Sequence, residues 1–334
     1  SYIFNPTIPG IEAADAILIV GANPRTEASL LNVRIRKRWR MAPLAVGVIG
    51  EPVDLTYPSH YIGAGPDSLA ALARGEHSFL DVLKEAKAPL VLVGAHAEPG
   101  VLAAAASLAK AIGAISAEWN GFGVLHTAAA RVGALDLGFV PGEGGLTFAQ
   151  MLEPGALDVL FNLGADERDA APGAFVIYQG SHGDRGASRA DVILPGAAYS
   201  EKSATWVNTE GRVQMGNRAA FPPGDAREDW AILRALSDVL GKRLPFDSLT
   251  ALRQALYAAH PHFAAIGAVE PGDVVEAAEK LIRLGSATGG PAFASPVTDF
   301  YLTNPIARAS RILAECSRLA RERAAEAQPL AAAE

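Results

Sequence analysis

The sequence predicts an α/β protein with a doubly wound, mostly parallel sheet and a helical C-terminal portion. Short apolar runs recur through the first two hundred residues, and helical periodicity separates most of them. These runs are apolar at almost every position, which is typical of parallel strands covered by helices on both faces. From about residue 199 the alternation stops, and a long polar segment is followed by helices.

The individual elements follow from these patterns. Strands are predicted at 16–21, 44–50, 89–94, 157–164, 174–180 and 190–198. Helices are predicted between them at Glu27–Arg40, Asp67–Arg74, Phe79–Ala86, Val101–Ile112 and Val124–Leu135. A short hairpin is predicted around Thr205–Gln214, followed by helices at Trp230–Leu240, Leu249–Ala259 and Asp273–Leu284.

The C-terminal portion reads as a linker and one amphipathic helix. The stretch 285–296 is rich in glycine, proline and serine, which is typical of a linker or a surface-hugging loop. The helix is predicted from Asn304–Pro305 through Arg323. Its apolar residues fall on one stripe that needs cover, from this chain or from a neighbouring subunit: Ala309, Ile312, Leu313, Cys316 and Ala320.

Composition shifts divide the chain into three segments. Residues 1–198 form a doubly wound α/β region of one or two lobes. Residues 199–284 form a polar loop or hairpin and the helices that pack on that region. Residues 285–334 are the linker and the C-terminal helix.

Composition also excludes several functions. Half of the 334 residues are hydrophobic, yet no apolar stretch approaches the roughly 20 residues of a membrane helix, so direct membrane insertion is not expected. Subtracting 36 acidic from 29 basic residues gives a net charge of −7, which disfavours nucleic-acid binding. The one cysteine, Cys316, cannot by itself hold a zinc ion or an iron–sulfur cluster, so no metal site is expected in this segment. The N-terminal SYIFNPTIPG lacks a secretory pattern, which indicates a reducing compartment.

Candidate binding residues lie where strands end, because ligands of doubly wound sheets sit beyond the carboxyl ends of the strands. Glycines there either let a phosphate approach the backbone or only permit tight turns. The asparagines and arginines suit a phosphate-bearing or amide-rich ligand, or else form a buried polar staple between two lobes. The candidates for this crevice are Gly21, Asn23, Arg25, Gly94, Gly164, Gln179, Asn208 and Arg212. A GxGxxG fingerprint and a P-loop are both absent from the sequence.

Two further motifs have an ordinary and a functional interpretation. SHGDRG places Ser181, His182 and Asp184 together, which suits a loop that satisfies its own backbone better than a catalytic triad or a metal pair. RIRKRWR at 34–40 suits the solvated last turns of a helix, with contact to a partner protein as the alternative. No catalytic residue is predicted.

Several long motifs resemble one known family. ADAILIVGANPRTEASLLNVRIRK, DVILPGAAYSEKSATWVNTEGRVQ and PPGDAREDWAILRALSDVLG resemble the molybdopterin-oxidoreductase fold. They look most like its degenerate version in the C-terminal region of the large iron–sulfur subunit of respiratory NADH:quinone oxidoreductase, complex I. PVDLTYPSHYIG, FLDVLKEAKAP and YQGSHGD are similar to the bacterial and mitochondrial branch of that family.

The resemblance implies cofactors outside this segment. In the family's complete subunit, iron–sulfur clusters are bound by a cysteine-rich N-terminal part, whereas two pterin dinucleotides occupy active molybdenum relatives. Here IGEPVDLT at 49–56 has Glu51 and Val53 in place of the Asp and Arg of a D-P-R-x-T-like loop. Ser203-Ala204-Thr205 stands where relatives have Gly-Thr. The crevice is therefore expected to be vestigial, with no cofactor in this segment.

The resemblance also implies a role and partners. The first hypothesis is a non-catalytic scaffold segment of the proton-pumping dehydrogenase. It would contact the NADH-binding flavoprotein subunit, its own N-terminal iron–sulfur domain and other peripheral-arm subunits, on the cytoplasmic or matrix side of the inner membrane. Two alternatives are a fragment of an active molybdopterin-dependent oxidoreductase and an independent nucleotide-binding module. Metal and pterin analysis distinguishes the first two, and binding of NADH or GTP would favour the third.

Overall fold

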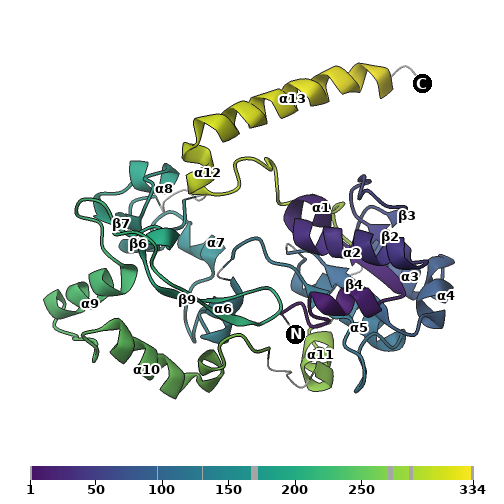
Figure 1. Cartoon of the computed structure of the whole chain (residues 1–334), viewed down its shortest axis with the longest axis horizontal. Coiled ribbons are helices and arrows are strands. Elements are labelled where there is room, and N and C mark those ends of the chain that lie inside the picture. Colours follow the sequence, from purple (N-terminus) through teal and green to yellow (C-terminus); the bar gives the residue numbers. More distant parts are fainter. Residues whose placement is uncertain are drawn as a thin grey trace. The chain divides into compact units, whose positions relative to one another are not determined.

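The computed structural model describes residues 2–95, 97–129, 131–166, 172–269, 274–285 and 289–331 (Figure 1). The chain forms two compact units that alternate along the sequence. The first unit consists of Ser1–Gly138, Trp206–Gln214 and Ala265–Thr298. The second unit consists of Phe139–Thr205, Met215–Ala264 and Asp299–Glu334.

The first unit is built on a five-stranded parallel sheet. Its strands are β1 (Ala16–Val20), β2 (Ala45–Ile49), β3 (His60–Gly63), β4 (Pro89–Val93) and β5 (Phe122–Val124), in the order β3-β2-β1-β4-β5. All five residues of the central strand β1 are buried. Each fully buried aliphatic side chain contributes roughly 1.5–3 kcal/mol, which explains why an uninterrupted apolar run forms the centre of the sheet. The predicted α/β fold class is confirmed.

Helices cover both faces of this sheet. Along β1, Ile17 and Ile19 face one core, and Leu18 and Val20 face the other. The first core is closed by α2 (Ser29–Met41) and the 3-10 helix η1 (Pro9–Ala13). The second core is closed by α3 (Pro66–Ala73), α4 (Phe79–Glu85), α5 (Pro99–Ala111) and α11 (Val274–Ile282), with α11 packed beside α5 (Figure 1).

The second unit contains a three-stranded parallel sheet. Its strands are β6 (Val159–Leu163), β7 (Phe175–Gly180) and β8 (Val192–Pro195), in the order β6-β7-β8. On one face, Val176 and Tyr178 are buried. On the other face, Val159 and Phe175 are neighbours in register and remain 54% and 48% exposed. This face is therefore only half covered by the part of the chain that the structure describes.

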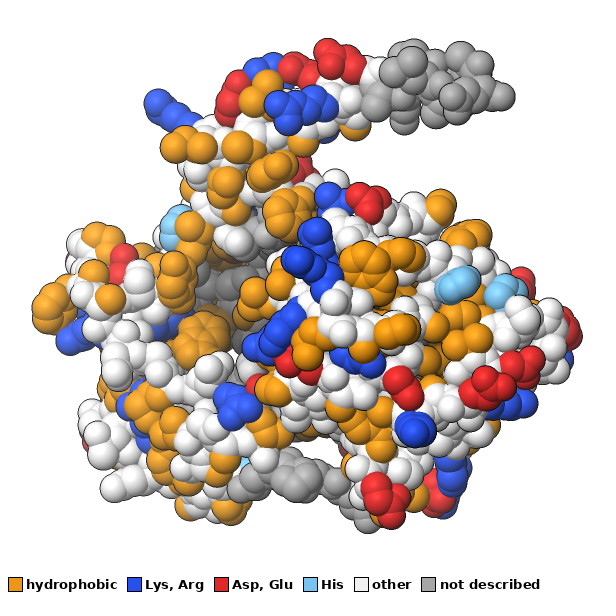
Figure 2. Space-filling view, turned by 45° about the vertical axis from the view of Figure 1, so that its right-hand side comes forward, with side chains coloured by type: hydrophobic (Ala, Val, Ile, Leu, Met, Phe, Trp, Pro, Cys, Tyr) orange, Lys and Arg blue, Asp and Glu red, His pale blue; other side chains and the backbone are white. Residues whose placement is uncertain are grey.

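The second unit is otherwise mainly helical. Its longer helices are α9 (Asp229–Val239), α10 (Leu249–Ala259) and α13 (Arg311–Ala331). Its short ones are α7 (Phe148–Met151), α8 (Arg185–Ser188), η2 (Tyr199–Glu201), η3 (Pro261–Ala264) and α12 (Pro305–Ala309). Side chains of both charges alternate with hydrophobic ones along α13, the helix at the top of Figure 2. No described helix is both long enough and apolar enough to cross a membrane.

The predicted hairpin is present as the two-stranded sheet of β9 (Ala204–Val207) and β10 (Val213–Gly216). Two short helices remain, α1 (Pro24–Glu27) and α6 (Arg131–Asp136). Boundaries of most predicted strands and helices differ from the observed ones by one to three residues.

The helix predicted at Val124–Leu135 is wrong at its start. Phe122–Val124 instead form β5 and pair with β4, where Phe122 is buried, and the helix begins only at Arg131. The single C-terminal helix is also wrong, because Ser310 has extended backbone angles and separates α12 from α13. Asp273, the predicted start of α11, lies outside the described residues. The division into 1–198, 199–284 and 285–334 stays a prediction.

Candidate functional site

Glycines mark the carboxyl edge of the five-stranded sheet. The amide of Gly21 donates to the carbonyl of Ile49 at 2.7 Å, and the amide of Gly94 donates to the carbonyl of Val20 at 2.9 Å. A Cβ on Gly94 would stand 1.8 Å from the carbonyl oxygen of Gly21. The close approach of two strand ends therefore requires the glycine at 94, as the steric interpretation predicts.

Asn23 and Arg25 follow β1 and are bound by the chain itself. The Asn23 side chain accepts from the Arg25 amide at 3.1 Å and caps α1, while the Asn23 amide donates to Glu27 Oε1 at 2.7 Å. Arg25 Nη1 donates to Asp54 Oδ2 at 2.7 Å and to the Asp54 carbonyl at 2.8 Å. The Thr56 amide and the Arg25 guanidinium together hold the pKa of Asp54 below its usual value, against the effect of burial.

A segment from far along the chain covers this edge. Residues 289–297, here called the strap, run beside the ends of β1 and β3. The Phe293 amide donates to the Ala64 carbonyl at 2.9 Å, and the Phe293 ring lies against Gly21. Ser295 Oγ donates to Glu27 Oε1 at 3.2 Å. The strap thus supplies both an apolar and a polar contact to the predicted crevice.

The strap fills the space that a ligand would need at this edge. The cavity left beside Gly21, Asn23, Glu51 and Phe293 measures about 10 Å³. That volume holds one water molecule at most, whereas ligand sites usually offer roughly 300–1,000 Å³. The residues present at the carboxyl edge of the five-stranded sheet do not fit a pterin dinucleotide.

Asn208 and Arg212 lie in the turn between β9 and β10, within a buried polar network. Asn208 Oδ1 accepts from the amides of Glu210 and Arg212 at 3.1 and 2.9 Å. Glu210, which is 3% exposed, accepts from Arg212 Nε at 2.9 Å and from the Ile8 amide at 2.7 Å. Arg212 also donates to the Gly267 carbonyl. Both predicted side chains therefore join three segments of the first unit.

The Glu210 carboxylate is the centre of this network. Burial by itself raises its pKa, but hydrogen bonds from the Ile8 amide, Arg212 and Asn208 outweigh that effect and hold the pKa below its usual value. Glu210 therefore stays ionised near neutral pH and binds the turn to the N-terminal segment. The motif N-x-E-G-R is explained here by local structure.

Gly164 and Gln179 belong to the second unit, at the carboxyl ends of β6 and β7. The Gly164 amide donates to the Gln179 carbonyl at 2.8 Å. The buried Gln179 side chain donates through Nε2 to Asp229 Oδ1 at 2.9 Å, and Lys202 also pairs with Asp229. These contacts bind the sheet edge to the first turn of α9. One crevice shared by all eight candidate residues stays a prediction.

The SHGDRG motif forms no triad. Ser181 Oγ and His182 Nδ1 are 2.8 Å apart, and both residues are exposed. Asp184 forms an ion pair with Arg308 of α12 instead. No group of three or more His, Cys, Asp or Glu side chains suited to a metal is found among the described residues.

The basic run at 34–40 has ordinary helix contacts. Arg34 and Lys37 pair with Glu12, and Arg38 donates to the Ala42 carbonyl just past the end of α2 at 3.1 Å. These contacts agree with the interpretation as the last turns of a helix.

The sequence interpretation missed Phe293 as a residue of the site. The strap was predicted only as a linker or surface-hugging loop, and residues 286–288 of that stretch lie outside the described residues. An aromatic residue isolated among glycine, proline and serine was the available signal, because such a side chain needs an apolar contact.

A doubly wound sheet whose carboxyl edge is lined by glycines places the chain in the class of α/β proteins built around a nucleotide-like cofactor site. The family model described as molybdopterin oxidoreductase matches residues 1–239, and the chain belongs to this family. A second model, which describes the C-terminal part of the large iron–sulfur (G-type) polypeptide of NADH-ubiquinone oxidoreductase, matches residues 268–316, which include the strap.

Curated relatives agree with the second match. The chain is 39% identical over 330 residues to the mitochondrial NADH-ubiquinone oxidoreductase 78 kDa subunit of Neurospora crassa, covering 95% of this chain and 43% of the relative. It is 38% identical over 328 residues to the 75 kDa subunit of Reclinomonas americana, covering 96% and 47%. It is 39% identical over 326 residues to NADH dehydrogenase (ubiquinone) iron-sulfur protein 1 of Solanum tuberosum, covering 95% and 43%. The chain spans less than half the length of these relatives.

Proposed function

We propose that this chain is a scaffold region of the large iron–sulfur subunit of a respiratory NADH:quinone oxidoreductase, with no catalytic residue or cofactor of its own. The observation that carries the proposal is the strap. Phe293 and Ser295 occupy the edge of the sheet where a cofactor of this fold class would bind, and they leave a cavity of about 10 Å³.

Composition supports the same proposal. Iron–sulfur clusters need several thiolates, and the whole sequence contains one cysteine, Cys316. In this proposal the clusters belong to a part of the longer protein outside the sequence given. This region then holds that part in place and carries no electrons.

The half-covered sheet of the second unit supports a place within a larger assembly. Parallel sheets are normally covered on both faces, yet Val159, Leu163 and Phe175 on one face of β6-β7-β8 are about half exposed. The proposed partners are the NADH-binding flavoprotein subunit, the iron–sulfur domain of its own subunit and other peripheral-arm subunits. The proposed location is the cytoplasmic or matrix side of the inner membrane, without insertion.

The test compares the wild-type chain with Phe293→Gly, which opens the crevice. Purified protein is oxidised in acid and assayed for pterin fluorescence, and its molybdenum and iron are measured by mass spectrometry. We expect far less than one pterin or metal per chain for both proteins. Stoichiometric pterin in the wild-type chain would contradict the proposal and favour an active molybdopterin oxidoreductase.

The scaffold role needs its own measurement. An affinity tag on this region within the intact respiratory enzyme should retain the flavoprotein subunit and NADH oxidation after purification. Phe293→Ala should lower the yield of assembled enzyme without changing turnover per assembled flavin. A fall in turnover at full assembly would contradict a purely structural role.

A further inference from the structure

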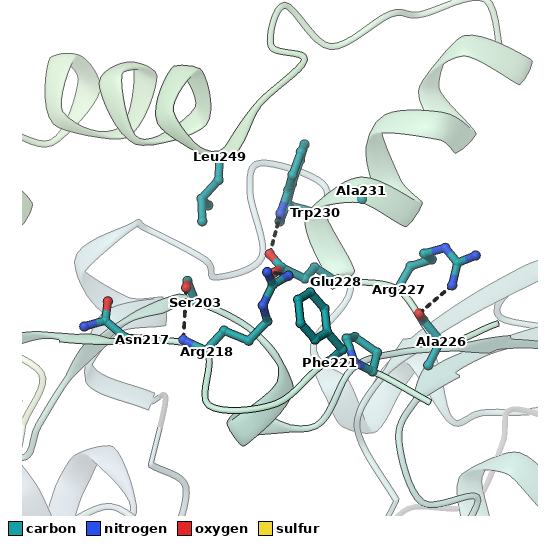
Figure 3. A pocket seen from close by; sticks show the side chains of 11 residues that line it. Ser203, Asn217, Arg218, Phe221, Ala226, Arg227, Glu228, Trp230, Ala231 and Leu249 are labelled. Atoms are coloured by element: carbon teal, nitrogen blue, oxygen red, sulfur yellow. Dashed lines mark hydrogen bonds and ion pairs between the residues drawn. The ribbon is translucent and has the colours of Figure 1, made fainter. Parts of the chain in front are cut away.

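The largest cavity found among the described residues lies entirely within the second unit. It measures about 710 Å³ and is open to solvent. It lies between the loop after β10, the first turn of α9 and the first residue of α10 (Figure 3). Cavities of this size hold one or two large side chains of a partner.

The walls combine cations with aromatic rings. The Arg218 guanidinium lies 4.3 Å from the centre of the Phe221 ring, and Figure 3 shows both side chains beside Glu228. Trp230 Nε1 donates to Glu228 Oε2 at 2.8 Å, which fixes the indole at the wall. Tryptophan and arginine are the residues that contribute most often to hot spots of protein interfaces.

Positive charge exceeds negative charge among the lining residues. Arg218 approaches Glu228 only to 3.7 Å, which is too long for a direct hydrogen bond. Arg227 Nη1 donates to the carbonyls of Ala226 and Gly224 at 2.9 and 3.2 Å, and within the described part of the chain it has no ion pair. Two arginines therefore face one carboxylate, on a chain whose net charge is −7.

We infer that this cavity is a docking site for an acidic segment of a partner polypeptide, with an aromatic side chain of that segment seated beside Phe221 and Trp230. Carboxylates beside the anchor would pair with Arg218 and Arg227, since guanidinium–carboxylate hydrogen bonds are among the strongest available at a surface. Phe221 is 78% exposed and gains apolar cover from the anchor.

The open form of the cavity favours a peptide over a small molecule, because an open groove buries less of a small ligand than an enclosed pocket does. The inference stands apart from the scaffold proposal. It concerns only residues of the second unit, none of which is a candidate for the cofactor crevice.

The test uses the full chain and one defined probe, the labelled nonapeptide Gly-Ser-Asp-Glu-Phe-Glu-Asp-Ser-Gly. Binding is followed by fluorescence anisotropy at low salt. We expect saturable binding in the micromolar range, at least tenfold weaker when Phe is replaced by Ala or when the acids are replaced by their amides. Added salt should weaken it, because exposed charge pairs are screened.

Matched variants locate the binding. Arg218→Gln with Arg227→Gln should weaken binding at least tenfold, and so should Phe221→Ser. The control, Arg318→Gln with Arg323→Gln, removes the same charge from the exposed surface of α13 and should leave binding unchanged. Circular dichroism establishes that each variant is folded.

Three outcomes would overturn the inference. The first is absence of peptide binding up to about 1 mM, which corresponds to roughly −4 kcal/mol. The second is equal binding by the pocket and control variants. The third is saturable binding of AMP at this cavity with no binding of the peptide, which would identify a small-molecule site.

Discussion

The ring of Phe293 lies against the α-carbon of Gly21, so that a Cβ at Gly21 would stand 3.1 Å from Phe293 Cδ1. Gly21 ends the central strand β1 with φ of +60°, a conformation that glycine adopts without strain. The strap therefore packs directly on the backbone at the most buried strand of the sheet. A residue at the point where cofactors usually bind has acquired a structural contact.

Replacing Phe293 by Ala should destabilise the first unit. Loss of a fully buried phenylalanine costs about 3–5 kcal/mol, and the partly buried Phe293 should cost about 2 kcal/mol. Urea unfolding measures the loss. Phe300→Ala, at a ring that is 52% exposed, provides the control and should cost clearly less. Equal effects of the two substitutions would mean that the strap adds little stability.

Gly94→Ala should be more severe than its size suggests. The new methyl group would meet the Gly21 carbonyl oxygen at 1.8 Å, and neither strand end can move without breaking sheet hydrogen bonds. We expect a loss of about 3 kcal/mol or more, or failure to fold. Gly142→Ala is the matched control, because nothing lies within 4 Å of the added carbon there. A wild-type melting temperature for Gly94→Ala would refute the steric explanation.

Glu210→Gln should remove a pH-dependent part of the stability. The folded protein holds the pKa of Glu210 below its usual value, so the carboxylate stabilises the fold at neutral pH. That stabilisation is lost as the pH falls below the ordinary glutamate pKa of about 4.3 towards the folded value. The variant should lose about 2 kcal/mol at pH 7 and differ less from the wild type at pH 3.

Unfolding free energies of both proteins at pH 7, 5 and 3 measure this effect. Glu118→Gln, at an exposed carboxylate, has the same charge change and should track the wild type. A gap between Glu210→Gln and the wild type that stays constant with pH would contradict the assignment of the effect to the ionised carboxylate.

Apolar runs predicted the central strands well, because β1 and β4 are buried on both faces and every residue in them must be apolar. Edge strands were not predictable in this way. His60 and Tyr61 of β3 are exposed, and the three residues of β5 are too few to show a period. Their strand conformation comes from pairing with neighbours that are distant in sequence.

The same limit applies to the site. The glycines that follow β1 and β4 were predictable because strand ends in this fold need tight turns. The contact between Phe293 and Gly21 joins residues that are far apart in sequence, and no local pattern encodes it. Asn208 and Arg212 had two open interpretations, and only the positions of Ile8 and Gly267 show that both serve the fold.

The apolar stripe predicted on the C-terminal helix is only partly covered. Leu313 and Cys316 are half-buried, whereas Ile312 is 76% exposed. One buried polar contact attaches the helix, since Ser317 Oγ donates to Asp299 Oδ2 at 2.5 Å. Ser317→Ala should therefore cost about 1–2 kcal/mol, because it leaves the Asp299 carboxylate without that donor. Urea unfolding of the isolated chain measures this loss, and an unchanged midpoint would contradict the role of the contact.

Ile312→Ser should leave the stability of the isolated chain within about 0.5 kcal/mol of the wild type, because a residue so exposed loses little on substitution. In the assembled respiratory enzyme, the same substitution should weaken retention of this region if a neighbouring subunit covers the stripe. Thermal unfolding of the chain and co-purification of the other subunits measure the two effects separately. A large loss of stability for Ile312→Ser in the isolated chain would instead assign the cover to this chain, and an unchanged result in both measurements would exclude Ile312 from any interface.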